Sequence, residues 1–587
     1  MLNEENKSKK ILLLYLIIGA AFTIFLGVML LTTVKPRHLP SLYSKKTSKS
    51  ERGSIISADG FHIASTKKLY KAVVNNRYID PDKRELFIQL FSIYADMDPN
   101  KVRKKLKTRK GLVVISYLIP EKQAQYLKKL SYELRRYKVF KAIANPKTGI
   151  KRTHGLSIIE SGETRIYPYG DVLTPVLGYT HKAEEDGYTR IKGVKGLEKR
   201  FDIELSSRQD GSTRGKRDVN GYIILNKDSF TKPNINGLNI KLTIPISLQI
   251  KVEEMTSRMK KDLRAKEVLV AVMDSKTGKV LTVASSNRFL PKAIKKRDYP
   301  FLNAGVIEYS FESGSVIKPI TFVLLLDKGR INPYDMINGH NGHYRIGKKI
   351  ITDEHKFDWL SAEDVIIHSS NIGIAQMAQK LSGIEFNKGL KSFGFSRKST
   401  PDLIYEKTGS IPTMNQLSKA IYKATCSYGY GMRTNLFQLL RAYSTFNNNG
   451  KMVNPQLVSS FIDEHNNETK LPNKQSIQVI KTSSAQKMKS ILIKTVQKGT
   501  GMKARIKGLE IGGKTGTAHI VEKGQYVKKY NTSFIGFVND GKTSLTLGAV
   551  IIQPKKSQFA SRTAVPVFRK TVEIMVEDGY LKPHVIK

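Results

Sequence analysis

Ser315-Val316-Ile317-Lys318 is the stretch around which the rest of this chain can be interpreted. A serine and a lysine three positions apart share one side of a helical turn, so the amine can face the hydroxyl. The apolar run from Ile320 to Leu326 predicts a core helix. Gly314 permits a tight turn before the serine, and Pro319 suits the first turn of a helix. We therefore expect Ser315 at a helix N-terminus, where the helix dipole favours developing negative charge.

Two further elements follow in order, Ser369-Ser370-Asn371 and Lys514-Thr515-Gly516-Thr517. The glycines of the last element let a substrate backbone lie against a strand, and its threonine hydroxyls can hydrogen-bond a carboxylate. The positive charge of Lys514 would lower the pKa of Lys318, and a neutral lysine can take the proton of a serine. The ordered set predicts acyl transfer through an ester of Ser315.

Each element alone is weak, because the chain contains matches elsewhere. Other Ser-x-x-Lys pairs are Ser65/Lys68, Ser229/Lys232, Ser257/Lys260 and Ser484/Lys487, and the second and third elements are mimicked by Ser285-Ser286-Asn287 and Lys407-Thr408-Gly409. The order of the three elements along the chain, and the residues around each of them, distinguish them from these other matches. We expect Ser369 to cap a helix beginning near Ile372 while its hydroxyl faces the cleft.

Composition indicates a globular protein of several domains with an anionic partner. The 587 residues include 99 Lys and Arg against 50 Asp and Glu, a net charge of +49. Nucleic acid, an anionic membrane surface and an anionic cell-wall polymer would all suit this charge. The densest basic run, Lys101 to Lys110, lacks the interleaved aromatic residues of a base-stacking surface, which disfavours nucleic acid.

Two residue types limit the chemistry further. Cys426 is the only cysteine, which excludes an intrachain disulfide. His340 and His343 lie in a Gly/Asn-rich loop without a third ligand, so we expect no metal site.

Residues 11–33 form an uncharged apolar stretch of 23 residues, enough for a helix across a bilayer. No small-residue cleavage site follows it, which favours an uncleaved anchor over a signal peptide. Lysines and arginines flank both ends, so charge does not set the orientation. We place the tail, residues 1–10, in the cytoplasm, because we expect the acyl-transfer chemistry to take place on the outer side of the membrane.

The remaining chain divides near residue 235. Residues 34–235 predict an N-terminal domain, in which the stretch from about 75 to 150 carries no chemical signature, and residues 236–587 predict the catalytic domain. In the latter, a hairpin at 268–284 and strands at 533–552 enclose mostly helical sequence. This order indicates an α+β domain whose sheet joins distant segments.

The motifs resemble those of the penicillin-binding proteins, and the chain as a whole is similar to their monofunctional class B. The similarity includes Arg52-Gly53, Asp59-Gly60, Arg165 through Gly178, Gly196-Leu197-Glu198 and most of 240–587. Ser369-Ser370-Asn371-Ile372-Gly373 and residues 529–537 resemble the division-type, FtsI-like branch. Ser313 departs from the family, which commonly has proline there. The resemblance implies an antiparallel transpeptidase sheet flanked by helices, an elongated N-terminal pedestal or dimerisation-type domain and one transmembrane helix.

The resemblance also implies a function, D,D-transpeptidation of peptidoglycan stem peptides during septal wall synthesis, with β-lactams as inhibitors and without a cofactor. It gives catalytic roles to Ser315, Lys318, Ser369, Asn371 and Lys514, and substrate binding to Thr515, Gly516 and Thr517. It implies an FtsW-like membrane glycosyltransferase and other divisome proteins as partners, and an inner-membrane anchor with the catalytic domain on the periplasmic side. An elongation-type transpeptidase, a D,D-carboxypeptidase or β-lactamase, and a non-enzymatic β-lactam sensor or scaffold stay open as alternatives.

Overall fold

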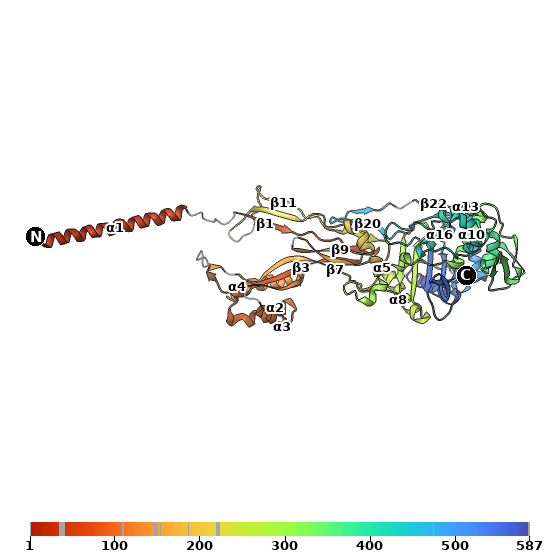
Figure 1. Ribbon diagram of the computed structural model, residues 1–587, viewed down its shortest axis with the longest axis horizontal. Coiled ribbons are helices and arrows are strands. Elements are labelled where there is room, and N and C mark those ends of the chain that lie inside the picture. The colour runs from red at the N-terminus through yellow and green to blue at the C-terminus, as the bar shows by residue number, and fades with distance from the viewer. Residues whose placement is uncertain are drawn as a thin grey trace. The chain divides into compact units, whose positions relative to one another are not determined.

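The computed structural model describes residues 2–34, 42–108, 111–144, 151–152, 154–185, 187–218, 223–472 and 475–584 (Figure 1). Its contacts divide the chain into two compact units, one of residues 1–49 with 209–234 and one of residues 50–208 with 235–587. The division thus falls within the predicted N-terminal domain, whose residues 209–234 join the start of the chain.

The first unit contains one long helix and a small sheet. Helix α1 (Leu2–Val34) runs without a break through the predicted tail and the predicted anchor. Its segment Asn6–Val34 is long and apolar enough to cross a membrane, and no other helix among the described residues is. The sheet has the order β1-β10-β11, with β1 (Tyr43–Ser48), β10 (Gly211–Lys216) and β11 (Phe230–Lys232).

The second unit contains the predicted α+β sheet, an antiparallel sheet of five strands in the order β14-β13-β25-β24-β23. The hairpin β13 (Glu267–Asp274) and β14 (Val280–Ser285) was expected from the sequence. It joins β23 (Glu510–Glu522), β24 (Gln525–Asn539) and β25 (Ser544–Ile552) from the far end of the chain. The prediction of a sheet that joins distant segments is confirmed.

Side chains of β13 alternate between two cores. Leu269, Ala271 and Met273 pack into one core, and the intervening valines pack into the other. A strand buried on both faces is a near-continuous apolar run, which explains the sequence of this segment. Helices α8 (Ile246–Leu263) and α18 (Ala564–Glu577) cover the second core.

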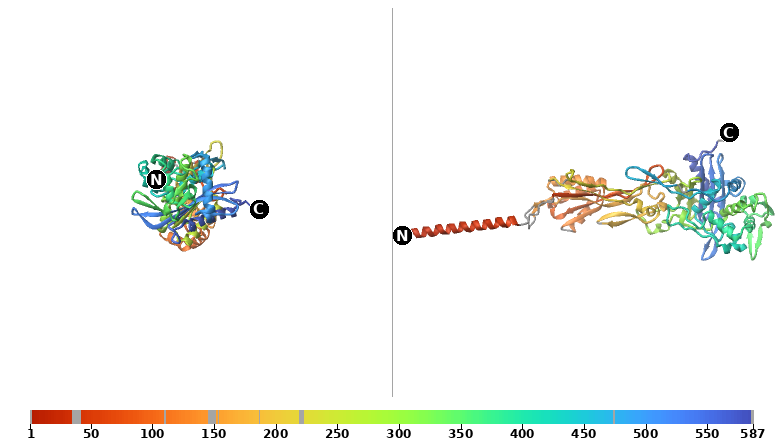
Figure 2. Two further views of the ribbon diagram at one scale, coloured as in Figure 1. Left: turned by 90° about the vertical axis from the view of Figure 1, so that its right-hand side faces the viewer. Right: turned by 90° about the horizontal axis from the view of Figure 1, so that it is seen from above.

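Helices that separate β14 from β23 in sequence contribute many residues of the first core, and Figure 2 draws this part of the chain in green to light blue. These helices are α9 (Gly305–Glu308), α10 (Lys318–Asp327), α11 (Ala362–Ile367), α12 (Asn371–Ala378), α13 (Gly383–Ser392), α14 (Met414–Ser418), α15 (Ala420–Ser427), α16 (Leu436–Asn447) and α17 (Thr482–Lys498). Short strand pairs join them: β15 (Met336–Asn338) with β18 (Trp359–Ser361), β16 (His343–Ile346) with β17 (Lys349–Thr352), and β19 (Lys451–Met452) with β22 (Ile477–Gln478).

The N-terminal part of the second unit is built on a sheet with the path β21-β20-β12-β2-β3-β7-β9-β8, and β4 also pairs with β3. The strands are β2 (Ile55–Ile56), β3 (His62–Asn75), β4 (Leu112–Pro120), β7 (Ser157–Ile166), β8 (Thr180–Glu185), β9 (Tyr188–Gly193), β12 (Asn239–Leu242), β20 (Val458–Ile462) and β21 (Glu468–Lys470). Helix α2 (Arg84–Ala95) and the Lys-rich helices α3 (Pro99–Lys107) and α4 (Glu121–Arg136) share a separate core with β3 and β4. Short helices α5 (Thr174–Leu177), α6 (Gly196–Arg200) and α7 (Asp202–Leu205) follow β7 and β9.

A buried ion cluster explains why charged residues occur in three separate stretches of this part. Glu198 is fully buried and accepts hydrogen bonds from Arg52 Nη2 at 2.8 Å and from Arg165 Nε at 2.7 Å. Arg52 Nη1 also lies 2.6 Å from Asp202. Buried charges persist only when they are paired in this way. The cluster ties β7 and α6 to the segment that enters β2.

Candidate active site

Ser315 lies in a 3₁₀ turn, Gly314–Ile317, that leads directly into α10 at Lys318. Gly314 has φ +61°, and a Cβ atom there would lie 2.6 Å from the carbonyl oxygen of Thr517. Glycine is therefore required by both conformation and close approach. The hydroxyl of Ser315 makes no hydrogen bond with the residues that the structure describes. It is thus available to a substrate.

Ser313 occupies the position where the family commonly has proline, directly before the turn Gly314–Ile317. Its side chain is buried, and its hydroxyl lies 3.1 Å from that of Thr434.

Two lysines meet at one serine hydroxyl. Lys318 Nζ lies 3.2 Å from Ser369 Oγ and donates to the Ser369 carbonyl at 2.5 Å. Lys514 Nζ donates to the same Oγ at 2.8 Å. The residues come from α10, from the turn before α12 and from β23, so the fold brings together all three sequence elements.

Burial makes the ammonium groups of both lysines lose their protons more easily than usual. Both side chains are fully buried, and burial lowers the pKa of Lys318 to about 7, against the opposing charges of Asp353 and Glu354. Burial also lowers the pKa of Lys514 well below its ordinary value, and the neighbouring Lys318 lowers it further. A neutral amine is therefore accessible here near neutral pH.

The expectation that Ser369 caps α12 is wrong, because Ser370 does so. Ser370 Oγ accepts a hydrogen bond from the backbone N–H of Gly373 at 2.9 Å. Ser369 instead has a left-handed backbone with φ +66°, which directs its hydroxyl to the lysines. Because the second serine supplies the cap, the first is free for chemistry.

Asp353 holds this segment in place and was not found from the sequence. Its carboxylate accepts hydrogen bonds from the Ser370 hydroxyl, from the Asn371 N–H at 2.5 Å and from the Ile372 N–H at 3.1 Å. It follows β17, a short strand with no recognisable motif. Only the three-dimensional contact identifies its role.

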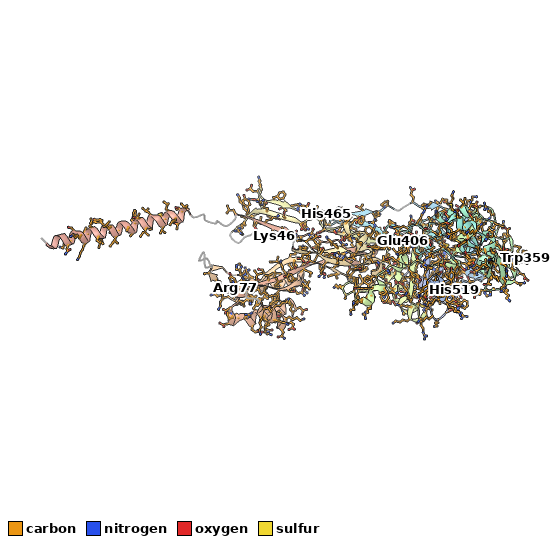
Figure 3. All side chains as sticks on the ribbon, viewed as in Figure 1. Lys46, Arg77, Trp359, Glu406, His465 and His519 are labelled. Atoms are coloured by element: carbon orange, nitrogen blue, oxygen red, sulfur yellow. The ribbon has the colours of Figure 1, made fainter. Side chains whose placement is uncertain are left out.

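The remaining predicted residues adjoin these groups along α12 and β23. Asn371 is partly exposed and donates from Nδ2 to the carbonyl of Thr352 at 3.0 Å. Thr515 Oγ1 lies 2.8 Å from Thr500 Oγ1, and Thr517 is partly exposed. Gly516 lets β23 pass close to the nucleophile, since a Cβ there would lie 2.8 Å from Val316 Cγ1. His519, which is labelled in Figure 3, lies further along β23. Its ring packs against the ring of Tyr530.

The mimicking motifs do not share this setting. Lys407-Thr408-Gly409 lies in a loop, as expected, with Gly409 at φ +67°.

Cys426 is buried, which raises its pKa to about 12 and makes a thiolate unfavourable.

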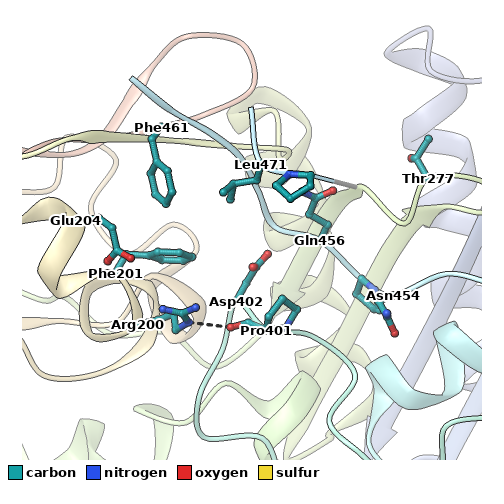
Figure 4. A pocket seen from close by; sticks show the side chains of 12 residues that line it. Arg200, Phe201, Glu204, Thr277, Pro401, Asp402, Asn454, Gln456, Phe461 and Leu471 are labelled. Carbon is teal, nitrogen blue, oxygen red and sulfur yellow. Dashed lines mark hydrogen bonds between the residues drawn. The ribbon is translucent and has the colours of Figure 1, made fainter. Parts of the chain in front are cut away.

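A cavity apart from the predicted catalytic residues lies between the N-terminal part of the second unit and the part that contains the five-stranded sheet (Figure 4). Phe201 and Phe461 give it an apolar wall, and Asp402 and Gln456 lie opposite. Arg200 Nε donates to the Pro401 carbonyl at 2.9 Å at its edge. None of the predicted site residues lines this cavity.

Comparison with known families agrees with the geometry. The family described as "Penicillin binding protein transpeptidase domain" matches residues 268–573, just over half of the chain. The chain belongs to the penicillin-binding protein transpeptidase family. A "Penicillin-binding Protein dimerisation domain" matches residues 47–242, which is the arrangement of class B penicillin-binding proteins.

Individual relatives support the same assignment. The peptidoglycan D,D-transpeptidase FtsI of Buchnera aphidicola subsp. Baizongia pistaciae is 26% identical over 597 residues, covering 99% of this chain and 97% of that protein. Stage V sporulation protein D of Bacillus subtilis is 26% identical over 497 residues, covering 83% and 75%. The FtsI-like resemblance extends over the full length of the chain.

Solved structures show the same fold. Penicillin-binding protein 2X of Streptococcus thermophilus has a TM-score of 0.75 at 19% identity, covering 90% of this chain and 80% of that chain. Penicillin-binding protein 3 from Mycobacterium tuberculosis, complexed with aztreonam, has a TM-score of 0.66 at 20% identity, covering 92% and 98%.

Proposed function

We propose that this protein is a peptidoglycan D,D-transpeptidase that cross-links stem peptides through an acyl-enzyme at Ser315. The observation that carries the proposal is the Ser369 hydroxyl, which contacts the buried amines of both Lys318 and Lys514. Two amines held together with lowered pKa values can exchange protons with a neighbouring serine near neutral pH. The relatives named as D,D-transpeptidases support the same chemistry.

The first half of the reaction forms the ester. Ser315 Oγ bonds to the carbonyl carbon of the penultimate D-alanine, and its proton passes to neutral Lys318. The bond between that carbon and the terminal D-alanine nitrogen breaks, and Ser369 relays a proton to the leaving amine. The backbone N–H groups of Ser315 and Thr517 would stabilise the oxyanion.

Binding groups hold the donor peptide in this scheme. Asn371 would orient the peptide amide, and Lys514, Thr515 and Thr517 would hold the terminal carboxylate, with Gly516 allowing close approach of the peptide to β23. A β-lactam would acylate Ser315 in the same way, by opening its ring amide. No step needs a metal or an organic cofactor.

The second half releases the ester. An amine of a neighbouring stem peptide attacks the ester carbon, the Ser315 oxygen leaves, and the amine proton returns to that oxygen through the lysine and serine. Water in place of the amine would give a D,D-carboxypeptidase.

The setting of the reaction is part of the proposal. Helix α1 would anchor the chain once in the cytoplasmic membrane with residues 1–10 inside and the catalytic domain outside. The similarity to FtsI favours septal synthesis. Glycan polymerisation would come from an FtsW-like partner, because neither matched domain is described as a glycosyltransferase.

The test is cross-linking by the full-length protein in detergent, on uncross-linked glycan strands bearing pentapeptides. Joined stem peptides with release of D-alanine are expected from the wild type and not from Ser315→Ala. Release of D-alanine without joined peptides would indicate a carboxypeptidase. If D-alanine is not released and no β-lactam labels the protein, the result would favour a non-enzymatic scaffold.

A further inference from the structure

A cavity of about 500 Å³ opens from one side of the catalytic centre. Thr515 and Thr517 of β23 form the wall that it shares with that centre. Its other walls come from the turn after β17, from the segment that follows α17 and from the 3₁₀ turn Ala560–Arg562. The cavity therefore begins where the terminal carboxylate of a donor peptide would lie.

The cavity carries an excess of positive charge. Lys498, Lys503 and Arg562 line it, against one carboxylate, Glu354. Lys498 is 59% exposed and lies 3.8 Å from Asp364. Lys503 and Arg562 are exposed, and neither forms an ion pair with a described residue. Two cations beside an active site without a partner carboxylate favour an anionic ligand.

The order of bond changes indicates which ligand would occupy this space. In the first half-reaction the terminal D-alanine leaves with its carboxylate near Thr515 and Thr517. In the second half-reaction an amine attacks the same carbon, which is the reverse of that departure with a different amine. By microscopic reversibility the incoming nitrogen takes the place of the departed nitrogen, and the group attached to it extends in the same direction.

We propose that this cavity binds the acceptor, and that Lys503 and Arg562 select amines carrying a carboxylate close to the reacting nitrogen. The proposal rests on the transpeptidase function proposed above and names the chemistry of its second substrate. A carboxylate on the carbon next to the amine would reach Thr515 and Thr517. A carboxylate one or two bonds further out would reach the two cations. Such charge complementarity changes selectivity and encounter more than the chemical step.

The rival explanation is that the cations hold the carboxylate of the donor. The two explanations differ in which half-reaction they affect. Penicillin carries the equivalent of the donor carboxylate, so its acylation of Ser315 reports the donor side alone. Partition of the acyl-enzyme between an amine and water reports the acceptor side alone.

The experiment uses the full-length protein in detergent with an acyl-D-alanine thioester as donor. Acceptors are D-glutamate, D-alanine and D-alaninamide, which carry two, one and no carboxylates. The ratio of aminolysis to hydrolysis is measured for wild type, for the double variant Lys503→Glu/Arg562→Glu and for Lys507→Glu. Lys507 is an exposed lysine four residues from Lys503 that does not line the cavity, so it controls for changed charge.

We expect the wild type to prefer D-glutamate and D-alanine to D-alaninamide. In the double variant the preference for D-glutamate over D-alaninamide should fall on the order of tenfold. Penicillin acylation should stay within about twofold of the wild-type rate, and Lys507→Glu should change neither quantity.

Unchanged acceptor preference in the double variant would overturn the proposal. A parallel loss of penicillin acylation would also overturn it, by assigning the cations to the donor. Absence of acylation in the wild type would contradict the proposed function itself, so the two failures are distinguishable.

Discussion

Lys514 Nζ lies 2.8 Å from Ser369 Oγ, a hydroxyl that Lys318 approaches from another element. Neither lysine reaches the surface, and the charge of Lys318 adds to burial in lowering the pKa of Lys514. Among the described residues no carboxylate forms an ion pair with either amine, and a buried pair of amines without such a partner is costly to protonate fully. Proton exchange through one serine is the chemistry that this arrangement permits.

The acylation rate should depend on the ionisation of Lys318. Its pKa of about 7 means that the amine is protonated below pH 7 and neutral above it. If the neutral amine is the base, the rate constant for penicillin acylation should rise about tenfold per pH unit below pH 7 and level off above it. Stopped-flow or fluorescent-penicillin kinetics from pH 5 to 9 would measure this. A flat profile would contradict the role of Lys318 as base.

A variant without the charge of Glu354 tests the direction in which this carboxylate moves the pKa of Lys318. The negative charge of Glu354 raises the pKa of Lys318, in opposition to burial. Glu354→Gln should therefore lower that pKa further and move the inflection to lower pH. A shift to higher pH would show that another group controls the profile.

Adjacent serines should give separable defects. Ser369→Ala removes the hydroxyl shared by the lysines and should slow penicillin acylation by about 10²–10³-fold with little change in thermal stability. Ser370→Ala removes the N-cap of α12 and should lower the free energy of unfolding by about 1 kcal/mol, with a smaller effect on acylation. Acylation kinetics and thermal unfolding of both variants measure the two effects. A loss of stability in Ser369→Ala together with slow acylation in Ser370→Ala would contradict the assignment and would indicate Ser369 as the N-cap.

Gly314 should not tolerate a side chain. Gly314→Ala combines a left-handed backbone with a Cβ 2.6 Å from the Thr517 carbonyl oxygen, so β23 and the nucleophile would have to separate. We expect loss of most β-lactam labelling and a lower unfolding midpoint. Gly524→Ala is the matched control, with a similar φ of +81° and no atom within 4 Å of the added Cβ. Equal effects at both positions would attribute the defect to strain alone.

The ion cluster should contribute strongly to stability away from the active site. Glu198→Ala leaves Arg52 and Arg165 buried without their carboxylate, which should cost about 3–5 kcal/mol. Glu85→Ala removes an exposed carboxylate paired with Arg103 and should hardly move the unfolding midpoint. Thermal unfolding of the full-length protein in detergent measures both. Similar midpoints for the two variants would contradict the importance of burial.

Much of the fold could be predicted because the relevant signals are local. The apolar run of residues 268–274 and the Gly-containing turn after it predicted the β13–β14 hairpin. The expected helix from residue 247 to about 265 corresponds to α8 at Ile246–Leu263. Ser315 and Lys318 were predicted as a pair because helix geometry alone brings residues three positions apart to one side.

Contacts between distant segments could not be predicted in the same way. Ser369 and Ser370 are equivalent in sequence, and only the left-handed backbone of Ser369 decides which one caps the helix. Asp353 reaches the same helix from a short strand without a motif. Lys503 and Arg562 line the same cavity although 59 positions separate them, so no local pattern could join them.

The most direct test of the account is the identity of the acylated residue. Full-length wild type and Ser315→Ala are incubated with fluorescent penicillin, digested and examined by mass spectrometry for the labelled peptide. We predict one covalent label in the wild type, on Ser315, and none in Ser315→Ala. Label on another residue of the wild type, or label retained in Ser315→Ala, would contradict the central claim.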